Sequence, residues 1–128
     1  MILLDSSILI PYLRKPSEPV RRRLANEKVF ICGVTRAEVL HGSRSNAGVV
    51  DFLRILDGIP LLDVTSADWD AVGLNLAMLR RNGLIVPFQD MIVATLAMRA
   101  DYELWCNDRH FGLMQAILPA LRLSSITS

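Results

Sequence analysis

Short apolar runs alternate with segments of helical periodicity along the chain. The apolar and β-branched runs that predict strands are Ile2–Leu4, Val29–Cys32, Ile59–Val64, Tyr102–Cys106 and Leu121–Ile126. Between them, apolar residues recur every three or four positions, the spacing of a helix with one buried face. Strands that alternate with helices are typical of right-handed βαβ units. We therefore expect an α/β fold with a parallel central sheet and helices on both of its faces.

Capping residues and helix breakers indicate where the helices begin and end. The predicted helices are 6–15, 17–26, 35–43, 48–56, 66–81 and 89–99, with a helical turn from Asp108. Ser6 or Ser7 and Ser66 are the expected N-caps of the first and fifth. Pro60 lies near the start of the 59–64 run, which favours an edge position or a later start for that strand.

The composition predicts one folded domain over residues 1–128. Hydrophobic residues make up 52% of the sequence, enough for a sizeable core. Cys32 and Cys106 are isolated in apolar runs, which favours buried, reduced thiols over a disulfide framework. The uncharged run Met91–Met98 is far shorter than the ~20 residues that span a bilayer. We expect a soluble, cytoplasmic protein without a membrane segment.

The formal net charge of +1 says little about partners, but the identity of the basic residues says more. Arg supplies all but two of the 14 basic residues, with dense runs at 21–23 and 80–81. The planar guanidinium suits phosphate recognition. Solvated helix faces would explain the same runs, so both interpretations stay open.

Four acids share one local setting, the passage from a strand to a helix. Asp5 follows the first strand, Glu38 and Asp90 lie in predicted first helical turns, and Asp108 follows the run 102–106. A doubly wound sheet brings strand carboxyl ends and helix N-termini to one edge, where ligands bind. The four carboxylates are therefore expected to converge.

Each acid also has a simpler explanation as a helix cap. Asp5 could cap its helix, and Thr35 with Glu38 fits a capping box. Asp90 and Asp108 suit the positive end of a helix dipole. The apolar neighbours of Asp5 and Asp90 favour a site, because buried charge requires a partner.

Electrostatics indicates what that partner is. At ~5 Å and an effective dielectric of ~20, two carboxylates repel by about 3 kcal/mol, and four would cost on the order of 15–20 kcal/mol. Oxygen ligands at this density suit Mg²⁺ or Mn²⁺. Such an ion activates water for in-line attack on a phosphate ester, here leaving a 5′-phosphate and a 3′-hydroxyl. Asp5 and Asp90 would be ligands, Glu38 and Asp108 would complete the shell or orient water, and Ser7 could donate to Asp5. His110 is expected at the surface or on a phosphate.

The motifs around these acids, taken in order, resemble a PIN-domain ribonuclease, in particular a VapC-type toxin of a type II toxin–antitoxin system. They are Leu3–Ile10, Thr35–Gly42, Gln89–Ala94 and Asn107–Phe111. The resemblance covers essentially the whole chain. It implies a three-layer α/β/α sandwich with a parallel central sheet, and Mg²⁺- or Mn²⁺-dependent cleavage of RNA, often tRNA or rRNA. A homodimer and a cognate VapB-type antitoxin are also implied.

By this resemblance the catalytic acids are Asp5, Glu38, Asp90 and Asp108, with Asp5, Asp90 and Asp108 on the metal and Ser7 in support. Cys106 stands where many relatives have Ser or Thr, which removes a hydroxyl near Asp108. Asp101 is interpreted as a solvated helix end.

Other phosphate enzymes and one non-enzymatic function are the alternatives. A haloacid dehalogenase-type phosphatase needs a second Asp where Ser7 stands, and a phospho-receiver domain needs a late Lys, which is missing after Lys28. A non-catalytic PIN-fold module that binds RNA or an antitoxin remains the alternative to a nuclease.

Overall fold

The computed structural model describes residues 1–124 and contains a parallel sheet of strand order β2-β1-β3-β4. The strands are β1 (Ile2–Leu4), β2 (Val29–Phe30), β3 (Glu103–Trp105) and β4 (Leu123–Ser124). Leu3 lies opposite Phe30 on one side and Leu104 on the other. β1 is therefore a central strand, which agrees with its complete burial.

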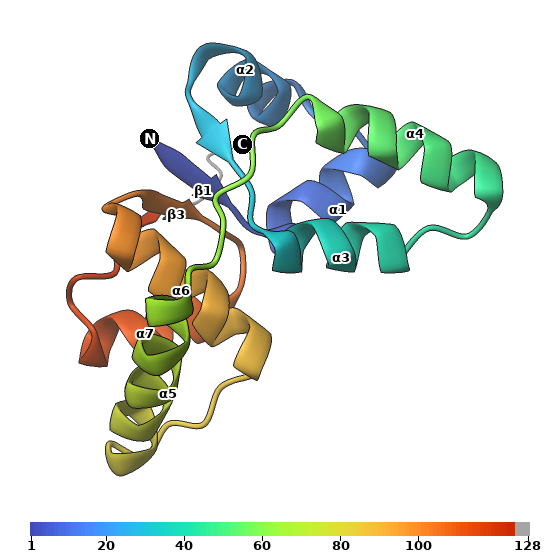
Figure 1. The fold of residues 1–128 in the computed structure, drawn as a ribbon. Coiled ribbons are helices and arrows are strands. Elements are labelled where there is room, and N and C mark those ends of the chain that lie inside the picture. Colours follow the sequence, from blue (N-terminus) through green and yellow to red (C-terminus); the bar gives the residue numbers. More distant parts are fainter. Residues whose placement is uncertain (125–128) are drawn as a thin grey trace.

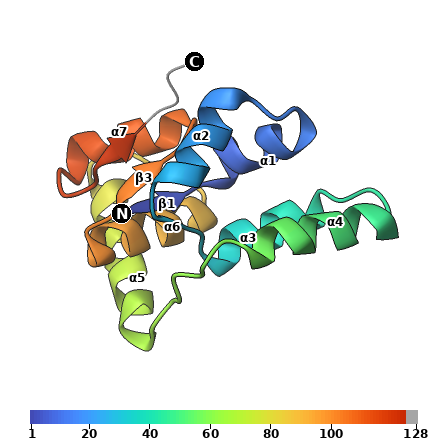
Figure 2. The same cartoon turned by 90° about the horizontal axis from the view of Figure 1, so that it is seen from above.

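Seven helices connect these strands within the described residues. They are α1 (Ser6–Arg14), α2 (Glu18–Asn26), α3 (Gly33–His41), α4 (Asn46–Asp57), α5 (Ser66–Arg81), α6 (Phe88–Ala100) and α7 (Arg109–Ile117). Figures 1 and 2 show α3 beside α4, and α5 beside α6. No helix of the described chain is both long enough and apolar enough to cross a membrane.

Alternation along β1 divides the core into two layers. Ile2 and Leu4 pack in a cluster with apolar residues of α1 to α4. Leu3 points to the other face and packs with residues of α5, α6 and α7. Side chains of a strand alternate between faces, so one short strand anchors both helical layers. The expected three-layer α/β/α sandwich with a parallel sheet is confirmed.

The predicted strand 59–64 is wrong. Only a single parallel bridge joins Leu61 to Ile31, in which the Ile31 amide donates to the Pro60 carbonyl at 3.0 Å. Leu61 is 46% exposed, and Pro60 has no amide proton for a ladder. The segment therefore touches the β2 edge without extending the sheet. The predicted end of the last strand, residues 125–126, lies outside the described residues.

Several helix starts also differ from prediction. Asp5, rather than Ser6 or Ser7, is the N-cap of α1, and Thr65, rather than Ser66, is the N-cap of α5. α3 begins at Gly33, two residues before the predicted start, with Cys32 as its N-cap, so buried Thr35 lies within its first turn. The ends are closer to prediction: Asn82 caps α5, and Gly83 follows with a φ of 81° that favours glycine.

Candidate metal centre at the carboxyl ends of the strands

The parallel sheet brings the strand ends of β1 and β3 together. Leu4 pairs with Trp105, and the Asp5 amide donates to the Trp105 carbonyl at 2.9 Å. Asp5 leaves β1 at this edge, and Asp108 follows β3 and caps α7. Asp90 lies in the first turn of α6. Glu38 lies two residues further into α3 than predicted, because that helix starts at Gly33.

Asp5 is a buried carboxylate whose orientation is fixed by Ser7. The Ser7 amide donates to Asp5 Oδ2 at 3.1 Å, and the Ser7 hydroxyl donates to the same oxygen at 2.5 Å. Ser7 Oγ in turn accepts from the Asn107 amide at 2.9 Å. Burial raises the pKa of Asp5 despite these hydrogen bonds, and the negative charge of Asp108 adds to the increase.

Asp90 is the acid whose pKa is raised by the charges of all three other acids. Burial, followed by the charges of Asp108, Asp5 and Glu38, raises the pKa of Asp90 to about 6, although His110 acts in the opposite direction. All four acids thus lie within electrostatic reach of one carboxyl group.

Glu38 is held by a hydroxyl rather than by a helix cap. Its Oε1 accepts from Ser6 Oγ at 3.2 Å. Burial and the nearby charge of Asp5 raise the pKa of Glu38. The predicted capping box with Thr35 is wrong, because the Thr35 hydroxyl lies 3.8 Å from Cys32 Sγ inside the helix start. In contrast, the side chains of Asp5 and Asp108 each accept a hydrogen bond from a backbone amide at a helix start. These two acids therefore cap a helix and also belong to the acidic cluster.

His110 is the site residue that the sequence interpretation missed. Its Nδ1 lies 3.0 Å from Asp108 Oδ1 and 3.5 Å from Asp90 Oδ2. With 35% of its side chain exposed, His110 lies at the surface as expected, but it also contacts the acids. Its contact with phosphate stays untested. The signal was present: a His two residues after a helix-capping Asp shares the first helical turn with that acid.

Two residues near the cluster behave differently from the acids. Burial, followed by the charge of Asp5, raises the pKa of Cys106 to about 12, so its thiol stays protonated beside the site. Asp101 ends α6 in the left-handed region, with 89% of its side chain exposed, and pairs with Arg122. The interpretation of Asp101 as a solvated helix end is confirmed.

The donor set fits a divalent cation. Ligand atoms from Asp90, Asp108 and His110 lie within 4.8 Å of one another. Over residues 1–124, no Lys or Arg forms an ion pair with any of the four acids. Carboxylates with raised pKa values and no cationic side chain favour a bound cation, which would remove their mutual repulsion.

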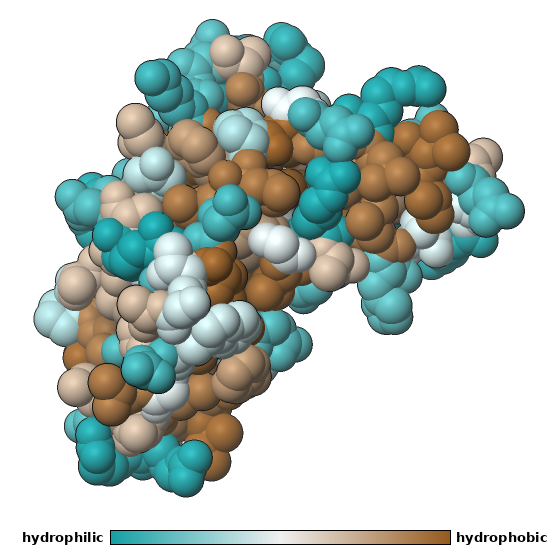
Figure 3. All heavy atoms as spheres, in the orientation of Figure 1, coloured by the Kyte–Doolittle hydropathy of each residue, from teal (hydrophilic) through white to brown (hydrophobic). Residues whose placement is uncertain are grey.

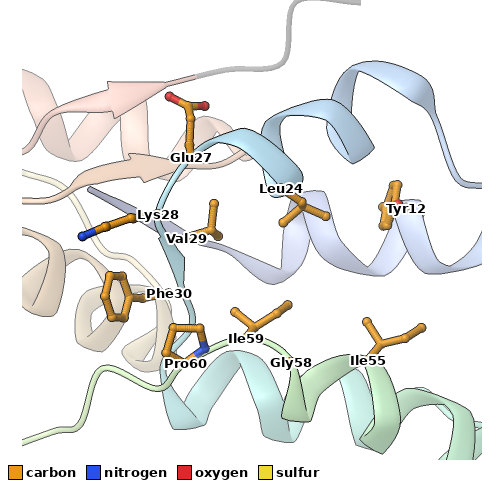
Figure 4. Close-up of a pocket in the computed structure, with 10 residues that line it drawn as sticks. All are labelled: Tyr12, Leu24, Glu27, Lys28, Val29, Phe30, Ile55, Gly58, Ile59 and Pro60. Carbon is orange, nitrogen blue, oxygen red and sulfur yellow. The ribbon is translucent and has the colours of Figure 1, made fainter.

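An apolar groove lies apart from this cluster, at the β2 edge. It has a volume of about 720 Å³. Figure 4 shows Leu24 and Val29 on one side of the groove and Ile55 and Ile59 on the other. None of the four acids lines it. The groove is thus a second surface feature, chemically unlike the acidic site.

Comparison with known proteins identifies the family. The PIN domain family model matches residues 2–115. The chain belongs to the PIN domain family. A search of curated proteins found no match.

Solved structures with the same fold include toxin–antitoxin complexes. The VapBC2 complex of Rickettsia felis, bound to a promoter DNA fragment, has a TM-score of 0.83 at 21% identity, with 99% of this chain and 100% of that chain covered. DNA-bound VapBC of Salmonella typhimurium has a TM-score of 0.80 at 20% identity, covering 97% and 96%. Mycobacterium tuberculosis VapC20, a Sarcin-Ricin loop cleaving toxin, has a TM-score of 0.67 at 13% identity, covering 91% and 94%. At these identities the likeness establishes the fold.

Proposed function

We propose that this protein is a VapC-type toxin, a metal-dependent endoribonuclease that hydrolyses RNA phosphodiester bonds and is neutralised by a VapB-type antitoxin. The observation that carries the proposal is the convergence of Asp5, Glu38, Asp90 and Asp108 at one sheet edge, with raised pKa values on three of them. Membership of the PIN family supports nuclease chemistry at this edge. The Sarcin-Ricin loop cleavage named for VapC20 supports a structured RNA, tRNA or rRNA, as the substrate class.

In this proposal, three acids of the cluster bind the metal ion and the fourth transfers a proton. Asp5, Asp90 and Asp108 would hold Mg²⁺ or Mn²⁺, which when bound lowers the pKa of water and offsets charge on the phosphate. Ser7 restricts the Asp5 carboxylate to one orientation through its bond to Oδ2. Glu38, whose carboxylate accepts a hydrogen bond from Ser6, would accept a proton from the attacking water, and its raised pKa supports this role as a base.

The test is cleavage of a mixed tRNA and rRNA pool by the purified chain with Mn²⁺ or Mg²⁺, with and without EDTA. We expect cleavage that EDTA abolishes and that Asp5→Asn lowers by at least about a hundredfold, since one electrostatic contact to the transition state is worth 2.7–4 kcal/mol. The matched control is Asp51→Asn, an exposed acid on α4, which should cut normally. Retained cleavage in Asp5→Asn would refute this mechanism. RNA retention without cutting by the wild type would favour the non-catalytic binding module.

The apolar groove at the β2 edge is proposed as the docking surface for the antitoxin. The neighbouring folds come from toxin–antitoxin complexes, and the groove is lined by aliphatic side chains with Glu27 and Lys28 at its margin. Figure 3 shows apolar residues continuing over the region of α4, which borders it. Such a groove suits an apolar segment of a small partner.

Co-expression and co-purification with a candidate VapB-type antitoxin test that assignment. Ile55→Asp, at a groove residue that is 44% exposed, should abolish capture while leaving RNA cleavage intact, because the acids lie elsewhere. Leu113→Asp, an exposed apolar residue on α7 outside the groove, is the control and should retain capture. Unchanged capture by Ile55→Asp would show that the groove is not part of the interface.

The expected homodimer remains a proposal. Exposed apolar residues on α5 and in the loop before α6 favour self-association: Leu74 is 69% exposed and Ile85 is 82% exposed. Light scattering at micromolar concentration should give twice the 14.3 kDa chain mass, and Leu74→Arg should lower it. A monomer mass for the wild type would contradict this.

A further inference from the structure

The imidazole of His110 is built into the acidic cluster. Asp108 Oδ1 accepts from the His110 amide at 2.9 Å, which fixes the first turn of α7. The same turn brings His110 Nδ1 to 3.0 Å from Asp108 Oδ1 and 3.5 Å from Asp90 Oδ2. The ring is therefore placed between a helix-capping acid and the acid of α6.

The Nδ1 atom has no hydrogen-bond partner although it is close to two carboxylates. It is shielded from solvent, and among residues 1–124 no group meets it in hydrogen-bonding geometry. The short distance to Asp108 Oδ1 is thus proximity without a directed bond. A buried polar atom that lacks a partner in the protein indicates a missing one.

The spacing of the three atoms fits ligands of one metal ion. With metal–ligand bonds of ~2.1 Å, two neighbouring ligands are about 3.0 Å apart at a right angle and about 3.4 Å apart at a tetrahedral angle. The distances of 3.0 Å and 3.5 Å from Nδ1 to the two oxygens fall at these values. The atoms of this trio lie within 4.8 Å of one another.

We propose that His110 binds the metal directly through Nδ1, together with Asp90 and Asp108, and that the centre therefore prefers a first-row transition ion such as Mn²⁺ over Mg²⁺. This inference rests on the proposed metal-dependent function and adds a nitrogen to a ligand set expected to contain only oxygen. Imidazole nitrogen binds transition ions well, whereas Mg²⁺ selects oxygen ligands and retains its waters.

A positioning role for His110 would explain part of the same geometry. An imidazolium between two carboxylates would reduce their repulsion without touching the metal. The two roles differ in one observable, because only a ligand transfers unpaired spin density from Mn²⁺ to its nitrogen. His41 provides a control, since it is the only other histidine and lies exposed on α3.

The experiment uses the full chain without a histidine tag, loaded with one equivalent of Mn²⁺ in the absence of RNA. Electron spin-echo envelope modulation should show coupling to ¹⁴N, replaced by ¹⁵N coupling in protein labelled with ¹⁵N-histidine. His110→Gln should lose the coupling, and His41→Gln should keep it. The labelled wild type keeps the test valid even if a variant folds poorly.

Affinity provides the second measurement. His110→Gln should lower Mn²⁺ affinity by about tenfold or more, the size of loss seen when residues around a metal site are replaced. Mg²⁺ affinity should stay within about twofold of the wild-type value. Mn²⁺ bound without nitrogen coupling, or an unchanged ratio of Mn²⁺ to Mg²⁺ affinity in His110→Gln, would overturn this inference. Either result would leave the nuclease proposal standing, because that proposal depends on RNA cleavage and its loss in Asp5→Asn.

Discussion

At the residue scale, Asp90 is destabilising in its ionised form. Its pKa rises from 3.8 to about 6 on folding, so the native state binds more protons than the unfolded state between these values. The contribution of Asp90 to the free energy of unfolding is therefore most favourable below pH 4, and it falls as the pH rises through 6. Burial and neighbouring negative charge also raise the pKa values of Asp5 and Glu38.

This linkage predicts that Asp90→Asn stabilises the metal-free protein at neutral pH. The gain should be near zero at pH 4 and reach on the order of 2–3 kcal/mol at pH 7, since one pKa unit corresponds to 1.36 kcal/mol. Urea unfolding in EDTA at several pH values measures the difference between wild type and variant. Asp51→Asn should show no such trend. A difference that does not change with pH would contradict the assigned cause.

Ser7 supports a second prediction, on orientation. Its hydroxyl accepts from the Asn107 amide and donates to Asp5 Oδ2, linking the start of α1 to the loop after β3. Ser7→Ala should lower RNA cleavage and Mn²⁺ affinity by about 10–100-fold, as expected when a group that orients a metal ligand is removed. Ser7→Thr keeps the hydroxyl and should recover most activity, and the exposed Ser66→Ala should have no effect. Full activity in Ser7→Ala would exclude the orienting role.

At the element scale, the α5–α6 pair carries a buried ion pair. Asp68, with 3% of its side chain exposed, accepts from Arg99 at 2.9 and 3.0 Å and from the Thr65 amide at 2.7 Å. Burial alone would raise the pKa of Asp68, but Arg99 and the Thr65 amide keep it below its usual value. The pair joins the start of α5 to the end of α6, the helix whose first turn carries Asp90.

Arg99→Leu should therefore destabilise the protein by about 2–3 kcal/mol, because it leaves a buried carboxylate without its cation. The value is set below that for a fully buried pair because Arg99 is 37% exposed. Chemical denaturation provides the measurement. Arg122→Leu is the control: it removes an ion pair with exposed Asp101 and should have a much smaller effect. Equal effects of the two variants would show that burial does not control this pair.

At the scale of the whole molecule, the two arginine runs have different surroundings. Arg21 and Arg22 pair with Glu18, while Arg23 stacks over the Trp105 ring at 4.6 Å and pairs with Glu103. Within the described residues, Arg80 and Arg81 form no ion pair with an acid. Arg80 also lines a small pocket with Phe88, at the start of the helix that carries Asp90.

RNA binding should therefore depend on the 80–81 run more than on the 21–22 run. In an Asp5→Asn background, Arg80→Gln with Arg81→Gln should weaken RNA binding and reduce the slope of log affinity against log salt by about 1–1.5. Arg21→Gln with Arg22→Gln should leave the slope nearly unchanged, because those guanidinium groups already have a carboxylate. Equal slopes in both double variants would indicate that Arg80 and Arg81 form a solvated helix face and do not contact phosphate.

The sequence by itself determined the strand–helix alternation and the order of the four acids. These follow from local periodicity and from residues next to one another in the chain. Parallel topology then requires the strand ends to meet at one edge, so the convergence of Asp5, Asp90 and Asp108 was predictable. The apolar identity of Ile2–Leu4 was enough to identify a buried strand.

Only the tertiary structure decided which neighbours those residues have. Glu38 is held by Ser6, which is 32 residues away, rather than by nearby Thr35. The 59–64 run has strand-like composition, but at the β2 edge it forms a single bridge. His110 joins the cluster because the first turn of α7 points its ring toward Asp90 of α6. Local pattern fixes which face a side chain occupies, whereas its partner depends on how distant elements pack.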